Sequence, residues 1–373
     1  MRIAVVGCGY AADFYMATLK LHPALEVAAA MDIVPANADR FSAYWRVPVF
    51  YDAADLINSA EFEMVLNLTN PQSHYEVTKR FLQCNKHVYS EKPLAQNFDD
   101  AKELVALAEA RDLLLGSAPC NHLAEAAQAV QRALSSNVIG TPKLAYAEMD
   151  DGFVALSPYQ NWANVSGAPW PYRDQFAIGC TLEHAGYYLT WLLLWFGPIK
   201  SVVSFQSLLH PGKPVADGVE GGDFSVACLQ FHSGTVARVT CSTVAAYDHS
   251  LRIVGDKGIL YANDCWSYKT RVYYRSYMRI RRRFMVSPLR RRIPMDAISF
   301  QLKRRSAAMR DFARGPAELA SALFEKRRPY ISADFSLHVT EVALAINNSS
   351  LINPSYETQS TFAPLGPLQA LRF

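Results

Sequence analysis

The residues Ser90-Glu91-Lys92-Pro93 place a glutamate and a lysine side by side, directly after the short apolar segment His87–Tyr89. The proline fixes its own φ and disfavours a helical conformation of the residue before it, so Lys92 should leave a strand end in an extended conformation. Ligands of open α/β sheets bind at the carboxyl ends of the strands. Lys92 is therefore a candidate for orienting and polarising a substrate hydroxyl or carbonyl. The alternative is a surface ion pair at a turn.

A second group of residues, near the N-terminus, has the pattern of a dinucleotide site. Residues 7–12 read GCGYAA, the G-x-G-x-x-A form, and follow an apolar run over residues 3–6. The first glycine permits a tight turn, the second lets the backbone approach a pyrophosphate, and the small third residue lets a helix pack on the strand. Asp32 ends the next predicted strand and can accept both ribose hydroxyls of NAD. We therefore predict NAD binding by Gly7, Gly9 and Asp32. No arginine directly follows Asp32, which favours NAD over NADP.

The elements that must position these residues alternate between strand and helix. Predicted strands at 25–31, 62–68, 86–90 and 113–117 are separated by helical stretches, which indicates an α/β, doubly wound Rossmann domain with a parallel sheet. We place this domain at residues 1–120.

Beyond residue 120 the pattern changes to consecutive strands joined by short turns, the first at 142–149 and the last at 259–262. This predicts an α+β domain over residues 121–373 with a large, mainly antiparallel open sheet. Two helices, Ser306–Lys326 and Ala333–Asn347, should close the chain, with Ser332 as the N-cap of the second and with the last helix and tail able to pack back on the first domain.

Composition limits the class of protein. The chain has 373 residues, of which 50% are hydrophobic and 19% charged, so it can build proper cores and is not disordered as a whole. The longest apolar run, Tyr187–Phe196, is too short to span a bilayer and indicates a buried helix, so we expect no transmembrane segment. The seven cysteines form no C-x-x-C pair. With no secretory signal pattern either, we expect reduced thiols, no metal site and a cytoplasmic location.

Positive charge is concentrated in one segment. Nine arginines and no acidic residue lie between Arg271 and Arg292. Because the whole chain carries +3, the rest of the chain without these nine arginines carries −6, so general affinity for nucleic acid is not implied. Tyrosines, methionines and a phenylalanine are interleaved with the arginines. Such a segment can contact an anionic membrane surface or capture an anionic substrate, such as a nucleotide-linked or lipid-linked sugar. The alternative is a solvated or subunit-facing insertion.

Together with these motifs, Thr69-Asn70-Pro71, Ile139-Gly140 and the stretch from Gly179 to Gly197 make the chain resemble the Gfo/Idh/MocA family, named after glucose–fructose oxidoreductase and inositol dehydrogenase. Members oxidise a sugar or cyclitol hydroxyl, or reduce the ketone, with NAD(P). The resemblance implies that Lys92 contacts the reacting oxygen and that a homodimer or homotetramer forms through the antiparallel sheet. It implies a further set of cofactor-binding residues: Tyr10, Ala11, Thr69, Asn70, Pro71, His74, Glu91, Lys92 and Asn121.

The family's usual second catalytic stretch, an aspartate followed four residues later by a histidine, corresponds here to Glu183 and Tyr187. Residues four apart share a helix face, so both can meet the substrate. The resemblance implies that Tyr187 is the acid/base, and the ammonium of Lys92 should lower its pKa. Two alternatives stay open, because Tyr188 could be the residue that points inward and His184 could be either a structural or a substrate-binding histidine.

The stretch Trp170–Asp174 is predicted to be a polar and aromatic loop, which by the resemblance lies over the active site. Tyr172 and Arg173 could hold substrate hydroxyls or a carboxylate there, or the loop could simply be anchored by its aromatic residues.

From these observations we predict an NAD(P)-dependent oxidoreductase that transfers hydride between nicotinamide and a hydroxyl or ketone of a sugar or sugar derivative. Catalysis would rest on Lys92, Glu183 and Tyr187, with Tyr172, Arg173 and His184 among the substrate-binding residues. Two alternatives are a cofactor-binding regulator without turnover and an enzyme that keeps NAD tightly bound through a closed redox cycle.

Overall fold

The computed structural model describes residues 1–216, 218–295, 310–348 and 355–366. Its first sheet has six parallel strands in the order β3-β2-β1-β4-β5-β6, which is the doubly wound Rossmann order. The predicted parallel sheet is therefore confirmed. The strands are β1 (Arg2–Val6), β2 (Glu26–Met31), β3 (Val49–Phe50), β4 (Met64–Asn67), β5 (His87–Ser90) and β6 (Leu115–Ser117).

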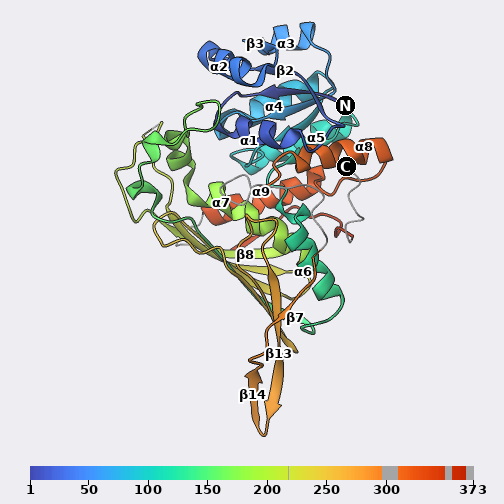
Figure 1. Ribbon diagram of the computed structural model, residues 1–373, viewed down its shortest axis with the longest axis vertical. Coiled ribbons are helices and arrows are strands. Elements are labelled where there is room, and N and C mark those ends of the chain that lie inside the picture. The colour runs from blue at the N-terminus through green and yellow to red at the C-terminus, as the bar shows by residue number, and fades with distance from the viewer. Residues whose placement is uncertain (217, 296–309, 349–354, 367–373) are drawn as a thin grey trace.

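The apolar residues of the central strands are buried on both faces, because helices cover both sides of the sheet (Figure 1). The strand order reverses at β1, which lies between β2 and β4. A ligand crevice is expected at this reversal, outside the carboxyl ends of the strands. The helices of this part are α1 (Tyr10–Leu19), α2 (Pro35–Trp45), α3 (Ala53–Ser59), α4 (His74–Gln83) and α5 (Phe98–Ala110).

The second sheet has ten strands in the order β14-β13-β12-β11-β7-β10-β9-β8-β16, with β15 paired to β13. Its neighbouring strands are antiparallel except for the parallel pair β7 and β10, so the predicted open, mainly antiparallel sheet is confirmed. The strands are β7 (Pro142–Asp150), β8 (Ile199–Ser207), β9 (Phe224–Phe231), β10 (Val236–Ser242), β11 (Leu251–Gly255), β12 (Gly258–Ala262), β13 (Val272–Ile280), β14 (Arg283–Val286), β15 (Arg291–Arg292) and β16 (Ser355–Glu357).

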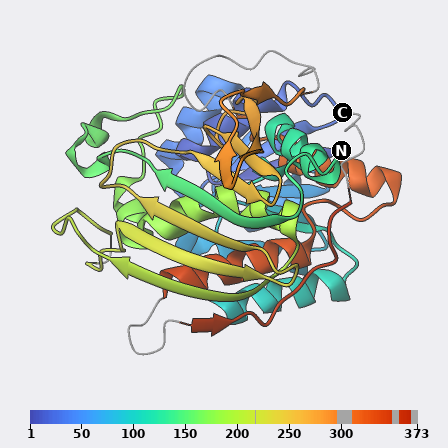
Figure 2. The ribbon, with the colours of Figure 1, turned by 90° about the horizontal axis from the view of Figure 1, so that it is seen from below.

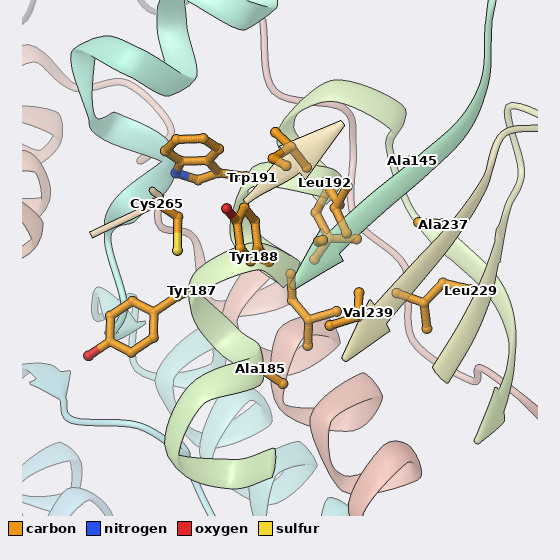
Figure 3. Packing of buried hydrophobic residues seen from close by; sticks show 14 of the residues in the cluster. Ala145, Ala185, Tyr187, Tyr188, Trp191, Leu192, Leu229, Ala237, Val239 and Cys265 are labelled. Atoms are coloured by element: carbon orange, nitrogen blue, oxygen red, sulfur yellow. The ribbon is translucent and has the colours of Figure 1, made fainter. Parts of the chain in front are cut away.

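Four further helices follow α5 along the chain: α6 (Glu125–Ser135), α7 (Tyr172–Phe196), α8 (Arg314–Glu325) and α9 (Ala333–Asn347). Helices α7 and α9 pack on one face of the ten-stranded sheet and lie behind it in Figure 2. The core between α7 and the strands includes the fully buried Tyr188 and Trp191 (Figure 3). Helix α8 contributes Leu319 to the core beneath the Rossmann sheet, and α9 packs against α5 and β6. The domain boundary near residue 120 stays a prediction.

Helix α7 contains a break that matters for the site. Gly179 has φ 80° and ψ 168°, so the chain turns there between two helical segments. At the break, the backbone N–H of Cys180 donates to the backbone oxygen of Gly222, in the segment before β9, at 2.9 Å. The second segment carries Glu183 and Tyr187, whose direction is therefore set by the turn at Gly179.

No helix among the described residues combines the length and the apolar character that a membrane crossing requires.

Some local predictions differ from the structure. Tyr172, Arg173 and Asp174 form the first turn of α7 rather than a loop, since Pro171 takes the N-cap position. The helix predicted to begin at Ser306 begins at Arg314; residues 306–309 lie outside the described residues. Ser332 occupies the N-cap position of α9, but its hydroxyl donates to Asp334 and not to the helix backbone.

Candidate active site

A cavity of about 670 Å³ lies between the carboxyl ends of the Rossmann strands and helix α7. Its walls contain the glycine turn after β1, the ends of β2 and β4, and Lys92 after β5. The opposite wall is formed by the second segment of α7, including Glu183 and Tyr187. The structure therefore brings residues from the two predicted motifs, which are far apart in sequence, into one cavity.

The glycine turn leaves space for a diphosphate. Gly7 has φ 94°, and a Cβ there would lie 2.6 Å from the backbone of Leu68. A Cβ at Gly9 would meet nothing within 4 Å, so this glycine faces open space at the N-terminus of α1. Free backbone N–H groups and the positive end of a helix dipole at this place suit a pyrophosphate.

Asp32, at the end of β2, is held in place by two backbone N–H groups. Its Oδ2 accepts from Cys8 and its Oδ1 from Val34, both at 2.9 Å. Each oxygen keeps a further lone pair, so the carboxylate can also accept the two ribose hydroxyls of NAD. The residues around this end of the cavity thus fit a nicotinamide dinucleotide.

Arg40 of α2 also lines this end of the cavity. It lies eight residues after Asp32, so the absence of an arginine directly after Asp32 did not reveal this cation. Its guanidinium donates to the backbone oxygen of Cys8 at 3.0 Å and to Asn37 Oδ1 at 2.9 Å. Two of its three nitrogens are therefore engaged by the protein, and the third, Nε, is buried without a partner.

The loop after β4 contributes Thr69, Asn70 and Pro71 to the cavity wall, as expected. His74 lies between this loop and the segment that carries Lys92, with its ring nitrogens 2.7 Å from the backbone oxygen of Pro93 and 2.9 Å from that of Thr69; a neutral ring donates to one of these two oxygens. Burial lowers the pKa of His74, which favours the neutral ring. The buried ring therefore packs the β4 loop against the segment that carries Lys92.

Lys92 forms the central contact of the site. Its Nζ lies 2.5 Å from Glu183 Oε2, and the two side chains are 15% and 21% exposed. Burial disfavours the charge on Lys92, but the negative charge of Glu183 and of other neighbours outweighs it and raises the pKa of the lysine. Burial also raises the pKa of Glu183, against the effect of Lys92. Beside them, Glu91 Oε1 accepts from the hydroxyl of Tyr15 at 2.7 Å.

Tyr187 faces the cavity, whereas Tyr188 does not. Figure 3 shows the Tyr187 ring directed away from the cluster that contains Tyr188 and Trp191. The hydroxyl of Tyr188 is used inside the core, where it donates to the backbone oxygen of His249. The pKa of Tyr187 is raised, because burial outweighs the lowering by Arg310 and Lys92. Lys92 therefore does lower this pKa, as expected, but burial has the larger effect, so the phenol stays protonated at neutral pH.

His184 lies at the cavity wall with Asp151, a residue that the motifs did not indicate. Asp151 Oδ2 is 3.4 Å from Nε2 of His184, and Oδ1 is 3.9 Å from Nε2 of His249. Burial raises the pKa of Asp151 to about 7, which Arg310 opposes and Glu183 reinforces. Burial lowers the pKa of His184 well below its usual range, so this ring is neutral.

No group of three or more histidine, cysteine or acidic side chains in the described part could hold a metal ion.

Arg310 is a second residue that the motifs did not indicate. Its guanidinium lies over the rings of Trp266, Phe312 and Tyr187, with distances of 4.3, 5.1 and 5.5 Å to the ring centroids. Within the described ranges, this guanidinium forms no hydrogen bond and no ion pair. Its N–H groups are therefore available to a ligand in the cavity. Only the final fold brings this residue beside Lys92, so no local pattern in the sequence could have located it.

Three predicted residues lie elsewhere. Tyr172 packs in an aromatic cluster with Tyr159, and Arg173 is exposed beside it; neither lines the cavity. Asn121 lies at a smaller hollow next to Lys92 and uses its side chain to donate to the backbone oxygen of Cys265 at 2.8 Å. These positions do not support direct substrate or cofactor contacts for the three residues.

A loop of the second domain closes over the dinucleotide end of the cavity. Residues 163 and 169 form a β-bridge at its base, and Trp162 and Trp170 line the cavity. The loop is fastened to α1, since Asn164 Nδ2 donates to the backbone oxygen of Tyr10 at 2.8 Å. Ser166 adds two hydrogen bonds to Asp13 Oδ2, at 2.8 and 2.9 Å.

The Rossmann sheet has the glycine turn of a dinucleotide site, and a second domain with an open sheet places polar groups opposite its strand ends. This combination defines a dinucleotide-dependent oxidoreductase. Comparison with known proteins agrees. A model of the "Oxidoreductase family, NAD-binding Rossmann fold" matches residues 1–118, and the "GFO/IDH/MocA C-terminal domain" matches residues 127–261. The chain belongs to the Gfo/Idh/MocA family.

Individual relatives are distant. The trans-1,2-dihydrobenzene-1,2-diol dehydrogenase of Danio rerio is 25% identical over 226 residues, which are 60% of this chain and 62% of that protein. An oxidoreductase from Agrobacterium radiobacter, solved with NAD+, L-tartaric acid and magnesium, has a TM-score of 0.76 at 18% identity and covers 96% of this chain and 98% of its own. The WlbA dehydrogenase from Bordetella pertussis, solved with NADH and UDP-GlcNAcA, has a TM-score of 0.71 at 17% identity, covering 93% and 94%. At these identities the likeness of the solved structures shows the fold.

Proposed function

We propose that the protein is an NAD(P)-dependent dehydrogenase or ketoreductase that acts on a hydroxyl or ketone of a sugar or sugar derivative. The observation that carries this proposal is the contact of Lys92 with Glu183 in a cavity that also contains Tyr187 and the dinucleotide turn. The sugar derivative in the complex of the WlbA dehydrogenase supports the substrate class, as does the shared fold.

The bound nicotinamide would supply or accept the hydride. Lys92 donates a hydrogen bond to the reacting oxygen and stabilises negative charge that develops on it. Tyr187, with its raised pKa, holds a proton and gives it to this oxygen when a ketone is reduced. Glu183 fixes the direction of the lysine and keeps it charged.

For the cofactor we propose a preference for NAD. The carboxylate of Asp32 accepts from a free ribose diol and repels a 2′-phosphate. Arg40 opposes this preference only weakly, because two of its nitrogens are already used by the protein. Calorimetric titration should give tighter binding of NADH than of NADPH. Equal or reversed affinities would remove this role from Asp32.

Turnover separates the proposal from a cofactor-binding regulator. The purified protein should oxidise NADH in the presence of ketosugars, either free or nucleotide-linked, and Lys92→Met should abolish the reaction while NADH still binds. A protein that binds NADH but shows no turnover with any ketosugar or sugar alcohol would instead fit the regulator.

One observation favours the second alternative, in which NAD stays bound through a closed redox cycle. The loop around Asn164 and Ser166 spans the dinucleotide end of the cavity and is hydrogen-bonded to α1. Cofactor that survives gel filtration in the wild type, and is lost from Asn164→Ala/Ser166→Ala, would support this cycle. Rapid exchange in both proteins would contradict it.

A further inference from the structure

The arginine-rich segment forms a β-hairpin that leaves the body of the protein. Strand β13 pairs with β12 only from Val272 to Ser276, and from Tyr277 to Ile280 it pairs with β14 alone. The hairpin projects from the end of the molecule opposite the Rossmann sheet (Figure 1). Every residue from 279 to 285 is exposed, so the tip has no core beneath it.

The arginines at the base of the hairpin are held by the hairpin itself. Arg290 lies 3.5 Å from the centroid of the Tyr273 ring, and Arg275 Nε donates to the backbone oxygen of Ser287 at 2.6 Å. At the tip, Arg281, Arg282 and Arg283 show no ion pair with any described residue. Their charges are therefore uncompensated by the parts of the chain that the structure describes.

Apolar side chains at the tip accompany these charges. Ile280, Phe284 and Met285 are 47%, 69% and 48% exposed. Directly paired residues of an antiparallel ladder point to the same face. Since Phe284 pairs with Arg279 and Ile280 with Arg283, each face of the tip carries both an apolar side chain and an arginine.

We propose that this tip, residues 279–285, docks end-on on an anionic phospholipid surface. When a hairpin enters a lipid interface end-on, its two faces meet the same surroundings. Both faces of this tip carry an arginine and an apolar side chain, as such an arrangement requires. The arginines would contact lipid phosphates while Phe284 and its apolar neighbours enter the boundary of the acyl chains. A flat protein surface would instead contact one face of the hairpin.

The same structure argues against capture of substrate by this segment. None of residues 271–292 lines the cavity, and the hairpin projects away from the domain that contains the dinucleotide turn. The earlier hypothesis of direct substrate capture is not supported by this geometry. Docking of the tip is also independent of the proposed reaction, because the residues involved are distinct.

Sedimentation of the full-length protein with vesicles tests the proposal. The protein should pellet with phosphatidylcholine vesicles that contain phosphatidylglycerol, and not with phosphatidylcholine alone. Arg281→Gln/Arg282→Gln/Arg283→Gln should weaken this binding by about 100-fold, from a factor of about five for each arginine. Phe284→Ser/Met285→Ser should weaken it while keeping the charge. A matched control, Arg46→Gln/Arg173→Gln/Arg252→Gln, removes three exposed arginines elsewhere and should bind as the wild type does.

Thermal unfolding and NADH binding should be unchanged in both tip variants, since the tip has no core contacts. Equal pelleting of the wild type and the triple tip variant would overturn the proposal, as would no pelleting at low salt. The proposal would also be overturned if, without vesicles, the triple tip variant had a lower molecular mass in solution than the wild type. The hairpin would then be a contact between protein chains.

Discussion

At the scale of single residues, the site is governed by the burial of charge. Lys92 and Glu183 are taken out of water together, and their contact at 2.5 Å offsets part of the lost hydration. For Tyr187, burial outweighs the opposing effect of Arg310 and Lys92, so the phenol keeps its proton. Tyr187 can therefore act as an acid when a ketone is reduced. To act as a base in the oxidation direction, Tyr187 would first have to lose its phenol proton to another group.

Asp151 gives the site a pH dependence near neutrality. Its pKa of about 7 means that it is neutral below pH 7 and adds a negative charge beside Glu183 above it. The activity of the wild type should therefore show a step near pH 7 that is absent from Asp151→Asn. A step of the same size in the variant would assign it to another group.

The same shift predicts an effect on stability. The pKa of Asp151 is raised from 3.8 to about 7 in the folded protein, so the unfolded chain releases this proton first and stability falls as the pH rises from about 4 to 7. Urea unfolding should show Asp151→Asn to be more stable than the wild type at pH 8, with a smaller difference at pH 5.

Arg310 should select anionic substrates. Of the four cations on the described cavity wall, Arg40, Lys92 and Lys213 already bond to protein groups, and Arg310 does not. Arg310→Gln should raise the KM for an acidic sugar by about 10-fold to 100-fold, which is the scale of a hydrogen bond to a charged group. The KM for a neutral sugar should not change.

The matched control for this prediction is Arg173→Gln, because Arg173 is an exposed arginine outside the cavity. A weaker Kd for NADH in Arg310→Gln, with an unchanged KM for the acidic sugar, would show that Arg310 serves the diphosphate of the cofactor instead.

At the scale of elements, the turn at Gly179 directs the catalytic segment of α7. A Cβ at Gly179 would lie 2.7 Å from the backbone oxygen of Gly222, in addition to the strain of a φ of 80°. Gly197 has a similar φ of 77° but nothing within 4 Å of its Cβ position. Gly197→Ala should cost about 1–3 kcal/mol of stability from strain alone, and Gly179→Ala should cost more.

Gly179→Ala should also lower turnover, because Glu183 and Tyr187 follow the turn, whereas Gly197→Ala should not. Chemical denaturation and kinetics of the two variants provide the measurement. Equal losses of stability and activity would mean that the contact with Gly222 has no special role.

The regular elements could be predicted from sequence because their patterns are local. The strands over residues 142–262 follow from alternation and turn residues, and α9 begins and ends at the predicted residues. The hairpin at 272–286 was not predicted as strands, since its apolar residues and arginines do not alternate; Tyr273 and Tyr274, for example, are adjacent. Asp151 and Arg310 could not be found either, because only the tertiary fold brings these residues to Lys92.

At the scale of the whole molecule, one face of the ten-stranded sheet is not packed against helices α7 and α9 (Figure 2). Val203 and Phe205 of β8 are 46% and 43% exposed there. The expected homodimer or homotetramer stays a prediction, and this face is where we expect the contact. Phe205→Glu should lower the mass measured by sedimentation equilibrium, and a monomeric wild type would contradict this.

The central claim is that Tyr187 and Lys92 act together on the reacting oxygen. The most direct measurement is the single-turnover rate of NADH oxidation at 340 nm with an active ketosugar, for the wild type, Tyr187→Phe, Lys92→Met and the double variant. Tyr187→Phe should be slower by about 100-fold to 10,000-fold with an unchanged Kd for NADH, and the double variant little slower than Lys92→Met. A nearly normal rate for Tyr187→Phe, with a large loss in Glu183→Gln, would contradict the account and move the proton transfer to Glu183.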